Sequence, residues 1–184
     1  MFIIVIQALL LFLPGYIANM MPVVFKHYGL IGVLLKPIDG GQQFFGDDLF
    51  GPHKTYLGFV SGIFGAVLTS VLLSLFYFSF PQARWIFLFP YEMPVALAWG
   101  TLCGFGALFG DLVKSFFKRR LHIKSGASFF PFDQLDFVIG GLSLAAFIYV
   151  PSWQHILVLL LLTPILHLLS NLIAYTLGMK HVWW

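Results

Sequence analysis

Three aspartates in the second half of the sequence could hold a metal ion. Asp111 follows a glycine-rich apolar run, and Asp133 and Asp136 lie further along the same charged stretch, residues 111–136. Carboxylate oxygens are hard ligands that suit Mg²⁺, and neighbouring cations suit the phosphates that Mg²⁺ accompanies. The stretch therefore predicts a Mg²⁺ site for a polyphosphate, with Asp111, Asp133 and Asp136 as the metal ligands and as catalytic residues.

Helix capping explains only part of this acidic pattern. Asp133 and Asp136 lie where a new helix is expected to begin, and the helix dipole favours an acid in the first turn. Asp111 is expected at the C-terminal end of a membrane helix, where the dipole disfavours an anion. We therefore expect Asp111 to have a cationic partner, either Lys114 or a metal ion.

Cations accompany these acids at spacings that suit a shared face. If the helix before Asp111 continues, Ser115 and Lys118 lie on the same face as this aspartate, four and seven residues further on. The whole cluster comprises Lys114, Lys118, Arg119, Arg120 and Lys124.

A second polar stretch, residues 26–54, is rich in glycine and proline and predicts a loop. Glycines let backbone N–H groups approach a phosphate closely, and Lys54 and Thr55 could complete an anion site at the start of the following helix. The stretch does not match the G-x-x-x-x-G-K-[ST] phosphate loop. Taken alone, it is more typical of a turn-rich connector.

The elements that must position these residues are apolar helices. Residues 1–25, 55–83, 93–110 and 137–179 contain no Asp, Glu, Lys or Arg. A hydrocarbon core of about 30 Å needs about 20 apolar residues of helix, so the first three runs predict one span each. The fourth run is too long for one span and is interrupted at Pro151, which predicts two. The predicted spans are 2–25, 55–80, 92–112, 135–150 and 153–177, with functional loops at 26–54 and 111–136.

Charge asymmetry sets the expected orientation of this single polytopic domain, residues 1–184. Five spans place nine of the ten cations on one side of the membrane and Arg84 alone on the other. The positive-inside rule then puts the N-terminus outside, and the C-terminus and both functional loops in the cytoplasm. Because the first residues lack the cations of a signal peptide, we expect residues 2–25 to be a retained helix. We expect a multi-pass protein of the cell membrane.

Composition excludes most other classes of protein. Of the 184 residues, 60% are hydrophobic and 9% are charged, whereas a soluble domain carries about 25% charged residues. The lone cysteine, Cys103, excludes an internal disulfide framework, and a net charge of +3 is too small for a nucleic-acid-binding protein. The expected fold class is therefore an all-α integral membrane protein with five transmembrane helices.

The sequence resembles a known family. The run G-D-L-x-x-S-x-x-K-R-R-x-x-x-K from Gly110, continued by P-x-D-Q-x-D from Pro131, resembles the signature of the CDP-archaeol synthases. These enzymes are relatives of the CTP:phosphatidate cytidylyltransferases. Three upstream segments, 18–23, 37–39 and 50–55, also match the archaeol-type pattern, and the absence of an H-G-G before the acids favours that branch over the phosphatidate enzymes.

The resemblance implies a CTP-dependent, Mg²⁺-dependent cytidylyltransferase of phospholipid biosynthesis. Its lipid substrate would be 2,3-bis-O-geranylgeranylglycerol phosphate or a related phosphatidate, which attacks the α-phosphate of CTP to give CDP-lipid and pyrophosphate. Asp111, Asp133 and Asp136 would then hold Mg²⁺. The residues expected to bind the nucleotide or the lipid phosphate are Lys54, Thr55, Ser115, Lys118, Arg119 and Lys124, and Lys124 is also expected to be catalytic.

A transporter or channel subunit without catalysis is the alternative. Such a protein would place ionisable residues at mid-bilayer along a path, whereas here the charged residues lie outside the apolar runs or at their ends. The sequence leaves open which lipid phosphate is used, how many metal ions bind and what the oligomeric state is.

Overall fold

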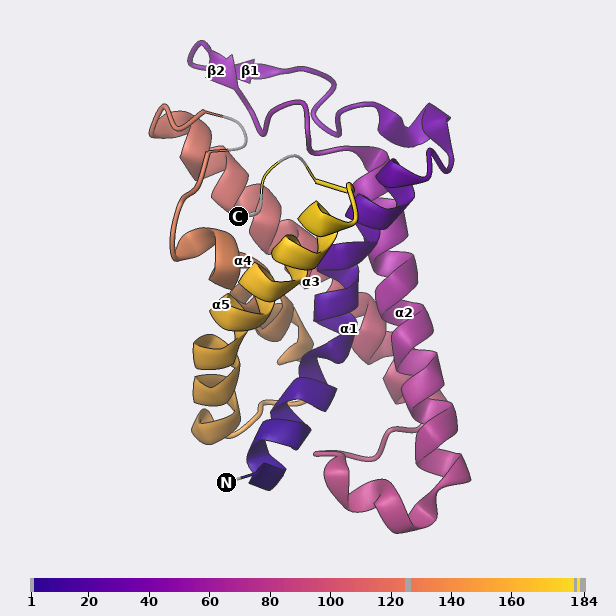
Figure 1. The fold of residues 1–184 in the computed structure, drawn as a ribbon. Coiled ribbons are helices and arrows are strands. Elements are labelled where there is room, and N and C mark those ends of the chain that lie inside the picture. The colour runs from indigo at the N-terminus through magenta and orange to yellow at the C-terminus, as the bar shows by residue number, and fades with distance from the viewer. Residues whose placement is uncertain (1, 125–126, 181, 183–184) are drawn as a thin grey trace.

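The protein is an α-helical bundle with one small hairpin (Figure 1). The computed structural model describes residues 2–124, 127–180 and 182. The α-helices are α1 (Phe2–His27), α2 (Tyr56–Ser79), α3 (Met93–Arg120), α4 (Phe132–Ala145) and α5 (Trp153–Thr176). Two 3₁₀ helices, η1 (Gly32–Leu35) and η2 (Pro81–Ile86), lie in the connections, and β1 (Gln43–Phe44) pairs antiparallel with β2 (Asp47–Asp48).

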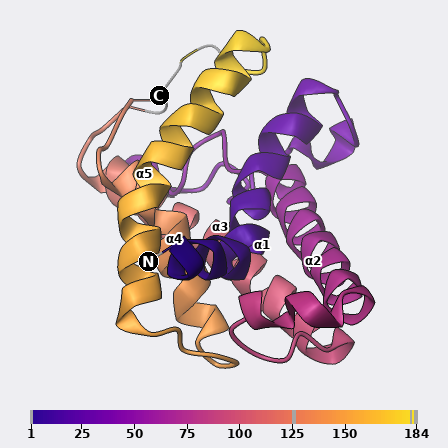
Figure 2. The same cartoon turned by 60° about the horizontal axis from the view of Figure 1, so that its bottom comes forward.

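The arrangement separates the two ends of the bundle. The N-terminus lies at one end together with η2, and the hairpin lies over the other end (Figure 1). In both views α1 runs between α2 on one side and α5 on the other (Figure 2). The bundle therefore has a polar end, formed where α1 and α3 end and α2 and α4 begin.

Four helices in the described part of the chain, α1, α2, α3 and α5, are long and apolar enough to cross a membrane. The remaining helix, α4, has 14 residues, which corresponds to about 21 Å and is short of the hydrocarbon thickness. The span predicted at 135–150 is thus a shorter helix that begins and ends earlier. Its neighbours explain part of this, because Val150 precedes Pro151 and a residue in that position disfavours the helical conformation.

The prediction that a loop begins at residue 111 was wrong. α3 continues through Asp111 to Arg120, so the first ten residues of the predicted loop 111–136 are helical. Asp111 consequently lies inside the helix rather than at its C-terminal end. The conflict with the helix dipole does not arise, but the expected sharing of one face with Ser115 and Lys118 holds.

Glycines bring α3 and α4 into backbone contact. A Cβ atom added to Gly140 would lie 2.3 Å from the carbonyl oxygen of Gly106, and one added to Gly110 would lie 2.3 Å from that of Asp136. Such distances leave no room for a side chain, so only glycine permits this approach. The contact places the start of α4 directly beside Asp111, one residue after Gly110.

Side chains in the core tie the first helix to the others. Trp99 of α3 is fully buried, and its indole N–H donates to the carbonyl of Leu11 at 3.0 Å. The hydroxyls of Tyr16 and Thr163 lie 2.7 Å apart and join α1 to α5. Bonds of this kind fix the helices relative to one another where packing of apolar surfaces gives little orientation.

Candidate active site

A cavity of about 720 Å³ opens at the polar end of the bundle. All five α-helices contribute to its wall, as do the α1–α2 connection, the α3–α4 connection and the segment after α5. Six cations and two aspartates line it, an excess of positive charge that suits a polyanionic ligand. The charged lining residues are Lys26, Lys54, Asp111, Lys114, Lys118, Arg119, Asp133 and Lys180.

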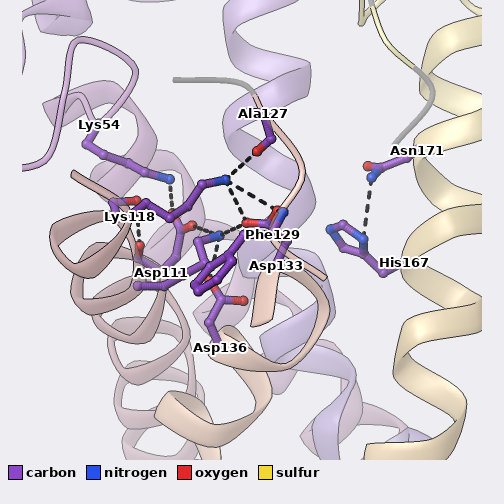
Figure 3. A network of polar contacts seen from close by, with 11 residues as sticks. Lys54, Asp111, Lys118, Ala127, Phe129, Asp133, Asp136, His167 and Asn171 are labelled. Atoms are coloured by element: carbon purple, nitrogen blue, oxygen red, sulfur yellow. Dashed lines mark hydrogen bonds and ion pairs between the residues drawn. The ribbon is translucent and has the colours of Figure 1, made fainter. Parts of the chain in front are cut away.

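The three predicted metal ligands meet at one point, the ammonium of Lys114. Lys114 Nζ lies 2.9 Å from Asp111 Oδ1, 3.0 Å from Asp133 Oδ1 and 2.8 Å from Asp136 Oδ2. α3 supplies Asp111 and Lys114, and α4 supplies the other two aspartates, which the glycine contact holds against α3. The sequence therefore correctly predicted that these carboxylates come together (Figure 3).

Two further lysines flank the cluster. Lys54, which precedes α2, forms an ion pair with Asp111 (Figure 3). Lys118, one turn beyond Lys114, is buried and donates to Asp133 Oδ1 at 3.2 Å and to the carbonyl of Ala127. Each lysine thus joins a connecting segment to the acidic centre.

Asp133 also organises the chain before α4. Its Oδ2 accepts a hydrogen bond from the backbone N–H of Phe129 at 2.6 Å. The ammonium of Lys114, 3.0 Å from Asp133 Oδ1, and the N–H of Phe129 both stabilise the charged carboxylate. Asp133 thus lies in the first turn of α4, where the dipole favours an acid, but no side-chain hydrogen bond caps the helix, and the same carboxylate also faces the cluster.

The other predicted residues occupy different surroundings. Thr55 is the N-cap of α2 and accepts from the N–H of Gly58 at 3.2 Å, while Ser115 donates to the carbonyl of Asp111 at 2.8 Å. Both residues line the cavity, as does Arg119. Lys124 is exposed and is not among the residues that line the cavity. Its predicted contact with CTP stays a prediction.

The connector between α1 and α2 is a folded structure, which the sequence did not indicate. Asp39 is buried, and its carboxylate accepts hydrogen bonds from the backbone N–H groups of Gly41, Phe50 and Gly51 at 2.9, 3.0 and 3.4 Å. A three-way bond of this kind closes the loop on itself and presents its last residues, Lys54 included, to the cavity.

Arg120 fastens the hairpin to the end of α3. Its guanidinium donates to the carbonyl oxygens of Phe44 at 2.9 Å and Asp48 at 2.7 Å, and it lies over the rings of Phe44 and Phe116. The sequence counted this arginine in the cationic cluster but not among the residues expected to bind the nucleotide, and the structure turns it toward the loop.

Several cavity residues were not predicted as site residues. Lys114 was expected only as a partner of Asp111. Gln134 is 3% exposed and its buried Oε1 has no partner among the described residues, which leaves an acceptor for a ligand. Lys180 donates to Asn171 Oδ1 at 2.6 Å and lines the cavity. Asn171 lies beside His167 on α5 (Figure 3). In the sequence, only the polar residues His167 and Asn171 within the apolar run 137–179 could have indicated this side of the cavity.

The positive wall of the cavity affects the one histidine of the connector that lines it. Burial lowers the pKa of His53, and the charges of Lys26, Lys54 and Arg119 lower it further. The imidazole is therefore neutral near pH 7, which leaves it able to accept a hydrogen bond.

Comparison with known proteins identifies the family. The family described as CarS-like, CDP-archaeol synthase, matches residues 1–184. The chain belongs to the CDP-archaeol synthase family. A CDP-archaeol synthase of Thermofilum pendens is 40% identical over 98% of this chain and 81% of its own, and one of Methanococcus aeolicus is 34% identical over 98% and 97%.

A solved structure supports the same assignment at the level of the fold. It concerns an intramembrane enzyme for archaeal membrane lipid biosynthesis, and it matches with a TM-score of 0.71 and 29% sequence identity. The match covers 90% of this chain and 92% of that one. The chain is accordingly a multi-pass membrane protein of the CDP-archaeol synthase family.

The acidic centre of this family member fits Mg²⁺ in donor type. Three carboxylates converge, and Asp136 Oδ2 is buried and makes no well-aligned hydrogen bond within the described ranges, although Lys114 Nζ is near. The carboxylate oxygens lie 2.8–3.0 Å from Lys114 Nζ at their centre. This is farther than the about 2.0–2.1 Å at which Mg²⁺ binds oxygen. Accordingly, no group of three or more acidic, histidine or cysteine side chains at metal-binding spacing occurs in the part of the chain described.

Proposed function

We propose that this protein is a CTP-dependent cytidylyltransferase that converts an archaeol-type lipid phosphate, 2,3-bis-O-geranylgeranylglycerol phosphate, into CDP-lipid. The observation that carries the proposal is the cavity, in which an acidic centre and an excess of cations lie at the end of a membrane bundle. Membership of the CDP-archaeol synthase family supports the same reaction. That combination does not favour a transporter, which would place charges along a path through the bilayer.

The reaction forms one bond and breaks one bond at a single phosphorus atom. An oxygen of the lipid phosphate bonds to the α-phosphorus of CTP, and the bond from that phosphorus to the bridging oxygen of the β-phosphate breaks. Pyrophosphate leaves with the electron pair. Such transfers depend mainly on positioning and on neutralisation of charge, which a fixed set of cations supplies.

The residues of this chain divide those tasks. Lys118 and Arg119 line the cavity and neutralise the phosphates that leave, while Lys54 holds a nucleotide or lipid phosphate from the α2 side. Lys124 adds charge from the edge. The hydroxyls of Thr55 and Ser115 stabilise the helix start and the helix turn that carry these groups.

Mg²⁺ is the cofactor we propose, held by Asp111, Asp133 and Asp136. When bound, it supplies positive charge that neutralises phosphate oxygens in the transition state. The carboxylate of Asp136 suits this role because its Oδ2 is buried without a well-aligned donor among the residues described.

We further propose that the protein lies in the cell membrane with its N-terminus outside and its cavity in the cytoplasm, where CTP is present. In this proposal α4 completes five membrane segments with α1, α2, α3 and α5. A reporter fused after Trp184 should be cytoplasmic. An extracytoplasmic reporter would contradict the orientation.

Product analysis tests the reaction. Purified protein is incubated with CTP, Mg²⁺ and either 2,3-bis-O-geranylgeranylglycerol phosphate or phosphatidate, and the lipids are analysed by mass spectrometry. We expect CDP-lipid and equimolar pyrophosphate from the first substrate. The absence of any CDP-lipid from either one would refute the proposed reaction, and preferential use of phosphatidate would refute the proposed substrate.

Lys124 has its own test, because the structure leaves its side chain exposed. If it contacts CTP, Lys124→Ala removes a charge-assisted hydrogen bond worth about 1.5–3 kcal/mol, or about ten- to a hundredfold in kcat/KM for CTP. Arg84, in η2 at the other end of the bundle, gives a control: Arg84→Ala should leave kcat/KM unchanged. A normal kcat/KM in Lys124→Ala would remove this residue from the site.

A further inference from the structure

The ammonium of Lys114 occupies the centre of the acidic cluster. Its distances to carboxylate oxygens of Asp111, Asp133 and Asp136 all fall between 2.8 and 3.0 Å, so the three carboxylates share it about equally. The lysine side chain is 13% exposed and the Asp136 side chain 6%. This is a largely buried cation surrounded by three carboxylate oxygens.

The other lysines do not substitute for it. Lys54 pairs with Asp111 and Lys118 pairs with Asp133, whereas Lys114 is the cation at ion-pair distance from Asp136 within the described residues. Removing one partner from a buried ion pair leaves an uncompensated charge, which is strongly destabilising. Without Lys114, the three carboxylates would therefore repel one another and need another cation.

A divalent ion bound by the same carboxylates needs the same place. Its oxygen ligands would lie at about 2.0–2.1 Å rather than at the distances seen around Lys114 Nζ, so the two cations exclude each other. Lys114 also lines the cavity. An ammonium displaced from the centre thus faces the space in which a polyphosphate would lie.

We propose that Lys114 is a built-in substitute for the divalent cation: it holds the three carboxylates together when no metal is bound, and it gives up the position when metal and nucleotide arrive. The inference rests on the metal site of the proposed function, but its tests do not require the enzyme to turn over. It makes the fold independent of metal, and it makes binding of metal alone weak because the ion must displace Lys114.

Metal binding without nucleotide tests this role. Free Mn²⁺ is measured by electron paramagnetic resonance as it is titrated into the wild type and into Lys114→Met, which keeps the length of the side chain and removes the charge. We expect Lys114→Met to bind Mn²⁺ at least about tenfold more tightly than the wild type, since no cation has to be displaced. Equal or weaker binding by Lys114→Met would overturn the proposal.

Thermal unfolding gives an independent measurement. The midpoint of the wild type should be the same in EDTA and in Mg²⁺, whereas that of Lys114→Met should be lower in EDTA and restored by Mg²⁺. If the variant folds only when Mg²⁺ is present throughout purification, the proposal holds. If Mg²⁺ restores nothing, Lys114 is a structural residue only and the proposal fails.

Lys36→Met is the matched control, because Lys36 is an exposed lysine of the connector. It should leave Mn²⁺ affinity and the effect of EDTA unchanged, and a change as large as that of Lys114→Met would refute a site-specific role. The two proposals also fail separately. Wild-type protein that makes no CDP-lipid refutes the proposed function. If the wild type is active but Lys114→Met has the Mn²⁺ affinity and the unfolding midpoints of the wild type, only this inference is refuted.

Discussion

Gly140→Ala should inactivate the enzyme by moving the acidic centre rather than by removing any group from it. The added Cβ would lie 2.3 Å from the carbonyl oxygen of Gly106 and 2.8 Å from the Cα of Gly110. Both are backbone atoms of α3, which cannot turn away as a flexible side chain can. Since ordinary contact begins at 3.4 Å, α4 must move away from α3 by about 1 Å.

That movement carries Asp136, one turn earlier on α4, away from Lys114. The present separation of 2.8 Å between Asp136 Oδ2 and Lys114 Nζ would widen by a similar amount. A misplacement of about 1 Å can cost about a hundredfold in rate, and overpacking costs about 1–3 kcal/mol of folding free energy. We expect kcat/KM for CTP to fall about a hundredfold in protein that still elutes as a single species with a helical circular dichroism spectrum.

Gly32→Ala in η1 is the matched control, because a Cβ atom at Gly32 meets nothing within 4 Å. It adds the same methyl group and should leave both activity and the unfolding midpoint near those of the wild type. The reasoning is refuted if folded Gly140→Ala retains kcat/KM within a few-fold of the wild type. It is also refuted if Gly32→Ala loses as much activity.

Three other predictions concern single groups. Asp133→Asn and Asp136→Asn should each reduce turnover at least about a hundredfold, as expected for loss of an electrostatic contact in the transition state; near-normal turnover in either variant would exclude that aspartate as a metal ligand. Arg120→Ala should release the hairpin at residues 43–48, seen as faster amide hydrogen exchange there, and unchanged exchange would contradict the clamp. Because folding lowers the pKa of His53, the unfolded chain takes up its proton first, so stability should fall as the pH drops below about 6.5. His53→Gln should lessen that loss of unfolding temperature between about pH 7.5 and about pH 5.5, and an identical loss would contradict the argument.

The sequence was most informative where local pattern and chemistry coincide. Uncharged apolar runs predicted α1, α2, α3 and α5, and the motif predicted that Asp111, Asp133 and Asp136 meet. These features depend on hydropathy and on short spacings, which are local properties of the chain.

The errors arose where tertiary contacts override local pattern. A charged stretch after residue 110 was taken as a loop, but α4 and the connector supply partners that let α3 continue to Arg120. Likewise, the length of α4 was read from an uncharged run, although a helix can end before such a run does. Lys114 could not be distinguished from neighbouring lysines, because its position depends on α4, which lies far from it in the chain.

The wall of the cavity, drawn from every helix, has a consequence for how the protein is made. Its lining begins at Asn19 and includes Lys180, so a growing chain has no complete site until α5 has emerged from the ribosome and packed. Until then α3 must enter the bilayer with charged residues and no α4 beside it. Asp111 and Lys114, one turn apart on the same helix, neutralise each other at 2.9 Å and lower the cost of that step. The pair that centres the finished site thus also serves the insertion of the unfinished one.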